Sequence, residues 1–256
     1  MKAIISDIHA NLEALTAVIE DIDALGTVVE IICLGDIIGY GPSPCECLDL
    51  LMPKMASLMG NHEDALLHGA DNFNPKARAA IDWTRRALGI SEPKAEVEQK
   101  RVKYLNELSQ NAMEGPHFLV HASPRFPIKE YIIPTDPHRP AKLDANFELF
   151  SHICFVGHSH IPGVMVQESP GRYTFYKPES LIGGTGYLFD TGEKAIVNVG
   201  SVGQPRDRNP DACYVTFDDE MAMFRRVKYD VAKTRAKVYQ NSELPHFEGD
   251  RLIEGR

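Results

Sequence analysis

The 256-residue sequence lacks several features that mark large classes of protein. Its apolar runs, such as Ile31 to Leu34, fall far short of the roughly 18 residues that a membrane-spanning helix needs. It has no excess of basic residues, with 27 Lys and Arg against 36 Asp and Glu and a net charge of -9. No basic stripe is available to neutralise phosphates along a duplex. We therefore expect neither an integral membrane protein nor a stable nucleic-acid partner.

Cysteine is also scarce and is not arranged in metal-binding pairs. The five cysteines are an odd set without a Cys-x-x-Cys motif, which favours a reducing environment over a disulfide framework. Cys45 and Cys47 are one residue apart, but without a second pair a structural metal site there is disfavoured. Asp7 and His9 interrupt the first apolar residues, so a secretory signal is not expected. These features predict a cytoplasmic protein.

The sequence does contain enough apolar residues, 43%, to form a substantial core. These residues are spaced differently in the two halves of the chain. The first half alternates short apolar strands, beginning at Lys2 to Ser6, with amphipathic helices, which predicts an α/β fold with a parallel sheet. Residues 75–110 are expected to be helical with a break near Pro93. From His117 onward, short strands separated by Gly, Pro and Asp turns predict a mainly β layer. No linker or internal repeat divides the chain, so we expect one domain, 1–256, containing two sheets.

Polar residues follow many of these strands directly. In α/β sheets, binding sites usually form at the carboxyl ends of the strands. The residues found at such ends here are Asp7, His9, Asp36, Asn61, His62, His121, His158 and His160. Each of them alone is more often a turn, a helix cap or an ordinary histidine than a ligand. Their joint occurrence at strand ends predicts a metal site.

The spacing of these residues suggests how they would meet. Asp7 and His9, and likewise His158 and His160, are two positions apart, so in an extended chain the members of each pair point the same way. Each pair could then hold one metal or straddle two. The Asp36 carboxylate has the two oxygens that a bridge between two cations requires.

This series of motifs, Asp7-x-His9, Gly35-Asp36-x-x-Gly39, Gly60-Asn61-His62-Glu63, His121 and Gly157-His158-x-His160, resembles the calcineurin-like metallophosphoesterase superfamily. The resemblance runs from residue 1 to about 230. Residues 35–44 and 198–207 are also similar to a bacterial branch of predicted phosphodiesterases, some of them likened to diadenosine-polyphosphate hydrolases. The chain departs from many members in having Glu63 in place of Asp and Met59 in place of Arg.

The resemblance implies a four-layer α/β/β/α sandwich of two mixed sheets flanked by helices, and a site with two divalent transition metals. The first metal would be held by Asp7, His9, Asp36 and His160, and the second by Asp36, Asn61, His121 and His158. His62 would be the catalytic histidine rather than a ligand. Oxygen and nitrogen ligands suit Mn, Fe, Zn, Co or Ni, with Mn favoured. Such a centre hydrolyses phosphoesters with a metal-bridging hydroxide as nucleophile.

The substrate is less strongly encoded. We expect a small phosphorylated molecule, with a nucleotide as one candidate, cleaved at a phosphodiester or phosphoanhydride bond. The Pro-rich segment 122–140 either lines the substrate cleft, with Arg125 contacting phosphate and Tyr131 stacking on a base, or is only a surface crossing. The turn with Gln204, Arg206 and Asp207 is favoured as structural over part of the pocket.

Two other functions remain open at this stage. A phosphomonoesterase, including a protein phosphatase, is disfavoured because Gly39-Tyr40-Gly41 replaces the Asp-Arg-Gly sequence of the family's protein phosphatases. A non-catalytic scaffold of the same fold is disfavoured because His62 is present.

Overall fold

The computed structural model describes residues 1–181, 183 and 185–256 and contains two mixed six-stranded sheets flanked by helices. The first sheet has the order β3-β2-β1-β11-β12-β9. Its strands are β1 (Lys2–Ile5), β2 (Glu30–Cys33), β3 (Ala56–Ser57), β9 (Gly186–Leu188), β11 (Ala212–Phe217) and β12 (Met221–Val227). β1, β2 and β3 are parallel, whereas β11 is antiparallel to β1.

The second sheet has the order β4-β5-β6-β10-β7-β8. Its strands are β4 (Asn111–Glu114), β5 (His117–Val120), β6 (Ile153–Val156), β7 (Gly163–Ser169), β8 (Arg172–Tyr176) and β10 (Ala195–Asn198). The central strands β5, β6 and β10 are parallel, and β4, β7 and β8 add antiparallel edges.

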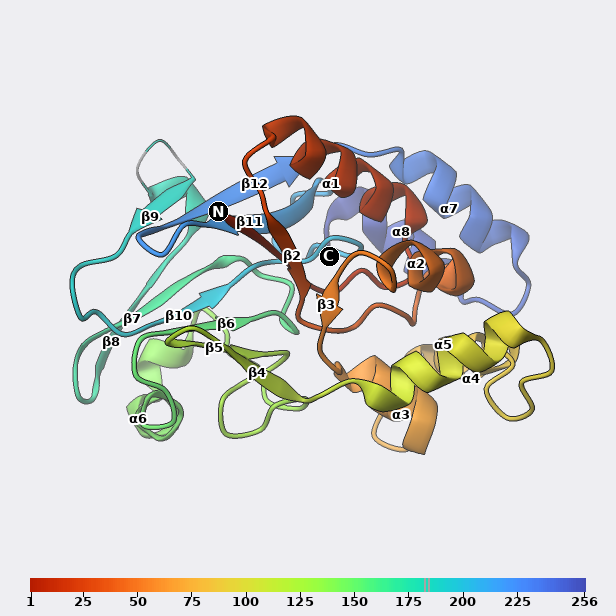
Figure 1. The fold of residues 1–256 in the computed structure, drawn as a ribbon, viewed down its shortest axis with the longest axis horizontal. Coiled ribbons are helices and arrows are strands. Elements are labelled where there is room, and N and C mark those ends of the chain that lie inside the picture. The colour runs from red at the N-terminus through yellow and green to blue at the C-terminus, as the bar shows by residue number, and fades with distance from the viewer. Residues whose placement is uncertain (182, 184) are drawn as a thin grey trace.

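The helices cover the outer faces of the sheets (Figure 1). They are α1 (Leu12–Leu25), α2 (Pro44–Leu51), α3 (Asn61–His68), α4 (Pro75–Ala87), α5 (Glu96–Glu107), α6 (Pro140–Phe147), α7 (Val231–Gln240) and α8 (His246–Glu254), with short 3-10 turns η1 (Asp136–His138) and η2 (Pro178–Ser180). None of the helices in the described residues is both long and apolar enough to cross a membrane.

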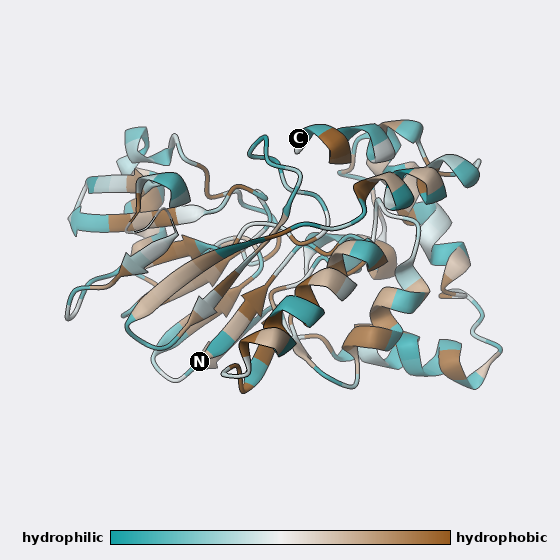
Figure 2. Cartoon of the chain, turned by 90° about the horizontal axis from the view of Figure 1, so that it is seen from above, coloured by the Kyte–Doolittle hydropathy of each residue, from teal (hydrophilic) through white to brown (hydrophobic). Residues whose placement is uncertain are grey.

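The period of the strands explains the layers. Along β1, Ala3 and Ile5 face the core that α1 and α2 share with the first sheet, whereas Ile4 faces the core between the two sheets. On the far side of the second sheet, Cys154 and its neighbours pack against Phe147 of α6. Helix, sheet, sheet and helix therefore form four layers, which confirms the fold class expected from the sequence. In Figure 2 the helices carry both hydrophilic and hydrophobic residues, as expected for elements with one face on a core.

Several elements were not anticipated. The sequence analysis missed β4, β9 and α8, and it treated residues up to Pro140 as an irregular crossing without expecting α6 to follow. β4 and β9 are short edge strands, which are stabilised by pairing with a neighbour rather than by their own sequence. The break near Pro93 is present, between α4 and α5.

The parallel strands decide where function is located. β1, β2 and β3 of one sheet and β5, β6 and β10 of the other run so that the segments following them meet at one edge of the sandwich. That edge carries the residues singled out from the sequence.

Candidate metal centre

Two groups of ligand-type side chains lie at this edge and share Asp36. The first consists of Asp7, His9, Asp36 and His160, and the second of Asp36, His121 and His158, all of them buried. Within each group the potential ligand atoms lie within 4.8 Å of one another. The residues come from the loops after β1, β2, β5 and β6, as the sequence analysis expected.

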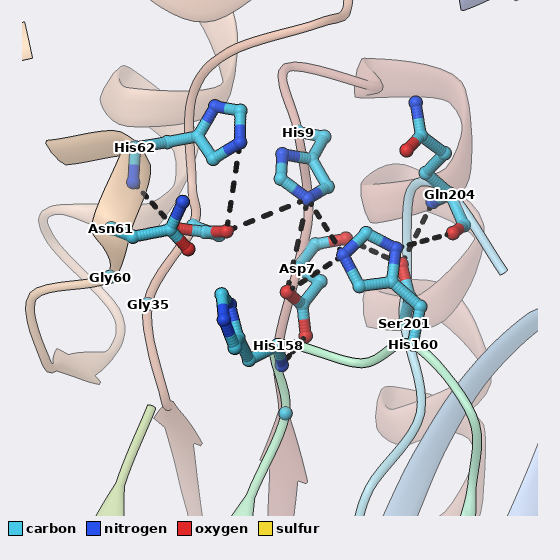
Figure 3. A network of polar contacts seen from close by, with 12 residues as sticks. Asp7, His9, Gly35, Gly60, Asn61, His62, His158, His160, Ser201 and Gln204 are labelled. Atoms are coloured by element: carbon cyan, nitrogen blue, oxygen red, sulfur yellow. Dashed lines mark hydrogen bonds and ion pairs between the residues drawn. The ribbon is translucent and has the colours of Figure 1, made fainter. Parts of the chain in front are cut away.

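The first group is centred on two imidazole nitrogens and two carboxylates. His160 Nε2 lies 3.1 Å from Asp7 Oδ1 and 3.1 Å from His9 Nε2. His9 Nε2 lies 3.7 Å from Asp36 Oδ2. Figure 3 shows Asp7 and His9, from the segment after β1, converging with His160, from the segment after β6.

The second group meets the same oxygen of Asp36. His121 Nε2 is 3.3 Å from Asp36 Oδ2, 3.2 Å from His158 Nδ1 and 3.1 Å from Asn61 Oδ1. Asn61 is thus brought to the same point as the three titratable residues. All seven residues that the sequence analysis assigned to metals lie together, and their role as ligands stays a prediction.

Backbone carbonyls fix the ring nitrogens of the first group. His160 Nδ1 lies 2.6 Å from Gln204 O, and His9 Nδ1 lies 3.3 Å from Ile38 O. Because a carbonyl only accepts, each Nδ1 carries the hydrogen, and each Nε2 has a free lone pair. Two such lone pairs facing each other repel unless a cation lies between them. A separation near 3 Å is that of two nitrogens bound about 2.0–2.1 Å from one ion. The residues present therefore fit a metal.

The electrostatics of the site also favour a bound cation. Burial raises the pKa of Asp36, but the neighbouring histidines, His121 first, outweigh it and hold that pKa well below its usual value. Burial lowers the pKa of His121, yet Asp36 outweighs burial and raises it to about 9. Two buried carboxylates therefore attract positive charge, and without metal a proton on His121 supplies part of it. Asp7 Oδ1 also has no hydrogen-bond donor within the described residues.

His62 faces this centre without belonging to either group. Its Nε2 lies 4.0 Å from Asp36 Oδ2, and its backbone N–H donates to Asp36 Oδ1 at 2.9 Å. The ring lies 4.4 Å from the ring of Tyr40 and 5.0 Å from that of Phe73, measured between centroids. Burial lowers the pKa of His62 to about 4, against the opposing effect of Asp36, so the ring is neutral near pH 7. His62 therefore lies beside both groups without belonging to either, and its catalytic role stays a prediction.

Glu63 holds the loop that presents Asp36. Its carboxylate accepts hydrogen bonds from the backbone N–H groups of Asp36, Ile37, Ile38 and Gly60, at 2.8–3.1 Å. A Cβ at Gly60 would lie 2.1 Å from Asp36 Oδ1, which explains why glycine precedes Asn61. The departure from Asp at position 63 is thus accommodated by a side chain that caps two loops at once.

The spacing argument for the paired residues was wrong in its geometry. Asp7 and His9 have φ values of 55° and 48°, and His158 and His160 have 61° and 58°, so neither pair lies in extended chain. Left-handed turns beyond the strand ends aim the side chains instead. As a result, His158 and His160 belong to different groups, whereas Asp7 and His9 belong to the same one.

The two predicted substrate contacts lie in different surroundings. The ring of Tyr131 stacks on that of His158, with centroids 4.0 Å apart. Arg125 is paired with Glu130, which also accepts from Ser123 and Asn146 at 2.9 Å. A phosphate would have to compete with that carboxylate for Arg125, so its role stays a prediction.

Some site residues were missed by sequence reasoning. Ser201 Oγ donates to the carbonyl of Asp7 at 2.8 Å, and Gln204 O orients His160. Both come from the loop after β10, whose apolar strand runs into polar residues as the other strands do. That signal was present but was read as structural.

Comparison with known proteins agrees with this geometry. Residues 1–220 match the family model described as "Calcineurin-like phosphoesterase superfamily domain". An uncharacterized protein from Methanocaldococcus jannaschii is 37% identical over 266 residues, covering 100% of this chain and 98% of the relative. The crystal structure of a metallophosphoesterase from Sphaerobacter thermophilus is 36% identical, with a TM-score of 0.81 over 99% of this chain and 98% of that one. A hypothetical protein from Pyrococcus horikoshii OT3, 20% identical, shares the fold with a TM-score of 0.74 over 100% and 98%.

Proposed function

The chain belongs to the calcineurin-like phosphoesterase superfamily, and from this premise we propose that it is a two-metal hydrolase of phosphodiester or nucleotide phosphoanhydride bonds. The observation that carries the proposal is the pair of buried ligand groups that share Asp36. A carboxylate shared by both groups, with His9 and His121 both approaching its Oδ2, is what a two-metal centre needs and what a single site does not.

When bound, two divalent ions would supply Lewis acidity toward phosphoryl oxygens and a hydroxide nucleophile at neutral pH. The chain's own residues do the rest. Asp7, His9, Asp36 and His160 would hold one ion, and Asp36, Asn61, His121 and His158 the other. Their nitrogen and oxygen atoms suit Mn, which we favour, as well as Fe, Zn, Co or Ni.

His62 would act on the leaving oxygen. Its ring is fixed by Tyr40 and Phe73 and is not taken up by a protein hydrogen bond at Nδ1 within the described residues. The negative charge of a bound phosphoryl group would favour the protonated ring, against the burial that now keeps it neutral. His62 can then donate a hydrogen bond or a proton to the oxygen that departs.

The remaining parts of the proposal concern a substrate contact, the cellular compartment and the branch of the superfamily. Tyr131, above His158, would stack on a nucleobase or aromatic leaving group. Five free thiols in the described residues favour a reducing compartment, so we propose a cytoplasmic location. The diadenosine-polyphosphate-hydrolase-like branch is the proposed placement within the superfamily.

A phosphomonoesterase is the main alternative, and an activity panel separates it. Protein stripped of metal is reconstituted with Mn or Zn and assayed on bis-p-nitrophenyl phosphate, p-nitrophenyl phosphate and a dinucleoside polyphosphate. We expect metal-dependent cleavage of the first and third. Cleavage of only the monoester would favour the alternative, and a metal-loaded protein inactive on all three would favour a scaffold.

A further inference from the structure

Arg206 lies at the margin of the metal centre, next to the backbone of His160. Its backbone N–H donates to His160 O at 3.2 Å, and its guanidinium donates from Nη2 to Gln204 Oε1 at 2.8 Å. Its Nε is buried and has no hydrogen-bond partner, and among the described residues it forms no ion pair. The adjacent Asp207 is paired with Arg226 instead. Because Nε is enclosed by the protein, an anion would have to meet this guanidinium through its Nη groups, of which Nη2 already donates to Gln204.

Arg206 lies near Tyr40, whose ring contacts two histidines of the metal centre. Its guanidinium carbon is 5.9 Å from the ring centroid of Tyr40, and that ring lies 4.4 Å from His62 and 4.7 Å from His9. Arg206 is thus one aromatic ring away from the catalytic histidine and from a ligand of the first group.

A second arginine raises the positive charge at this place. The guanidinium carbon of Arg251, from α8, is also 5.9 Å from the ring of Tyr40. Burial and then the charge of Arg206 lower the pKa of Arg251, so the two guanidinium groups repel each other. Glu248 is shared between Arg251, at 3.5 Å, and Gln204, at 3.2 Å, and leaves one of the two charges unbalanced. In a protein of net charge -9 this local excess is unusual.

Arg206 also lines a pocket beside the centre. The pocket has a volume of about 430 Å³, within the range of small-ligand sites. Its other lining residues include Pro134 and Ile161, the basic Lys177 and Arg208, and the acidic Glu179 and Asp207, of which Asp207 is paired with Arg226. Ile161 directly follows the ligand residue His160, and Pro134 belongs to the segment whose Tyr131 covers His158. Two chain segments beside the metal centre, the one that carries His160 and the one that carries Tyr131, therefore also contribute residues to the pocket.

We propose that Arg206 is a specificity-determining residue that binds the phosphoryl group next to the scissile one, with the adjoining pocket holding the group beyond it. The substrate class is then a molecule with adjacent phosphoryl groups, a nucleotide phosphoanhydride, rather than a simple phosphoester. This inference rests on the proposed function. A guanidinium suits the role because it binds phosphate oxygens through two parallel hydrogen bonds.

The test compares Arg206→Gln and Arg206→Lys with a control, Arg78→Gln, whose residue is about half exposed on α4 and pairs with Asp71. Each metal-loaded variant is assayed on a dinucleoside polyphosphate and on bis-p-nitrophenyl phosphate, which has one phosphorus. We expect Arg206→Gln to raise KM for the first substrate about 10- to 100-fold, the value of a hydrogen-bonded charge, and to change the second by less than about threefold. Arg206→Lys should recover part of the loss, and Arg78→Gln should resemble the wild type. Equal effects on both substrates, or none, would overturn the inference.

Binding is measured in parallel, by titration calorimetry with ADP and AMP. The wild type should prefer ADP, and Arg206→Gln should lose that preference with its metal content unchanged. If the wild type cleaves neither substrate, the proposed function fails, and these affinities alone decide the inference: a lost preference supports it and an unchanged one overturns it. If the wild type cleaves only bis-p-nitrophenyl phosphate, the inference fails and the proposed function stands.

Discussion

Replacing Gly39 by alanine tests the placement of His62 without touching a ligand. Gly39 has φ of 87°, and a Cβ there would lie 2.0 Å from His62 Nδ1 and 3.0 Å from its Cε1 and Cγ. Ordinary contact begins near 3.4 Å, so the ring would have to move by more than about 1 Å. Tyr40 and Phe73 lie on either side and limit where it can go. A displacement of about 1 Å at a reacting group costs about 100-fold in rate, so kcat should fall by that factor.

The control for backbone strain is Gly26→Ala at the end of α1. Gly26 has φ of 63°, and a Cβ there meets nothing within 4 Å. Both substitutions place alanine in the left-handed region, which should lower the free energy of unfolding by about 1–2 kcal/mol, and Gly39→Ala should lower it further because its Cβ also clashes with His62. Only Gly39→Ala should lower kcat, with metal content unchanged.

The assays are steady-state kinetics, elemental analysis of the purified variants and denaturant unfolding. Gly39→Ala should add little to His62→Ala in the double variant, because both remove the same group. The reasoning is refuted if Gly39→Ala keeps the wild-type kcat, or if Gly26→Ala loses as much.

Three further predictions concern the centre and its flanking loop. Asp36→Asn should weaken both metal sites by at least about 100-fold, since even the loss of a residue that only orients a ligand costs about 10- to 100-fold; His9→Ala should mainly weaken one, and metal titration compares them. His62→Ala should retain both metals and lower kcat by about 10² to 10⁴, most for poor leaving groups; an equal loss for nitrophenyl esters together with lost metal would make His62 a ligand. Burial raises the pKa of Glu130, but hydrogen bonds, the strongest of them from Arg125, outweigh burial and lower the pKa to about 2. The ionised Glu130 therefore stabilises the folded protein fully above about pH 4.5, and this stabilisation is lost as pH falls toward 2. Unfolding of Glu130→Gln should therefore differ from the wild type at pH 6 and converge with it near pH 2, and a difference that persists at pH 2 would contradict this.

The sequence was informative where the position of a residue in a strand or helix is enough to indicate what it contacts. Asp7, Asp36 and His121 follow apolar strands, and parallel strands bring such positions to one edge, so their meeting could be predicted. The helical face of α1 was equally readable, from Leu15, Ile19 and the capping Asn11.

What could not be predicted depends on backbone geometry and on partners distant in sequence. The left-handed turn at His158 and His160 sends the two rings to different groups, and no spacing rule encodes that. The sequence favours a structural role for the turn that contains Arg206 and Asp207. In the structure, Asp207 forms an ion pair with Arg226 of β12, and Arg206 forms none within the described residues. Such pairings follow from the folded sheet order, which local sequence does not reveal.

Anomalous scattering from crystals of the Mn-loaded protein tests the central claim most directly. We predict two metal ions per chain, one among Asp7, His9 and His160 and the other among Asn61, His121 and His158, with Asp36 contacting both. A single ion at full metal saturation, or a second ion bound without Asp36, would contradict the account.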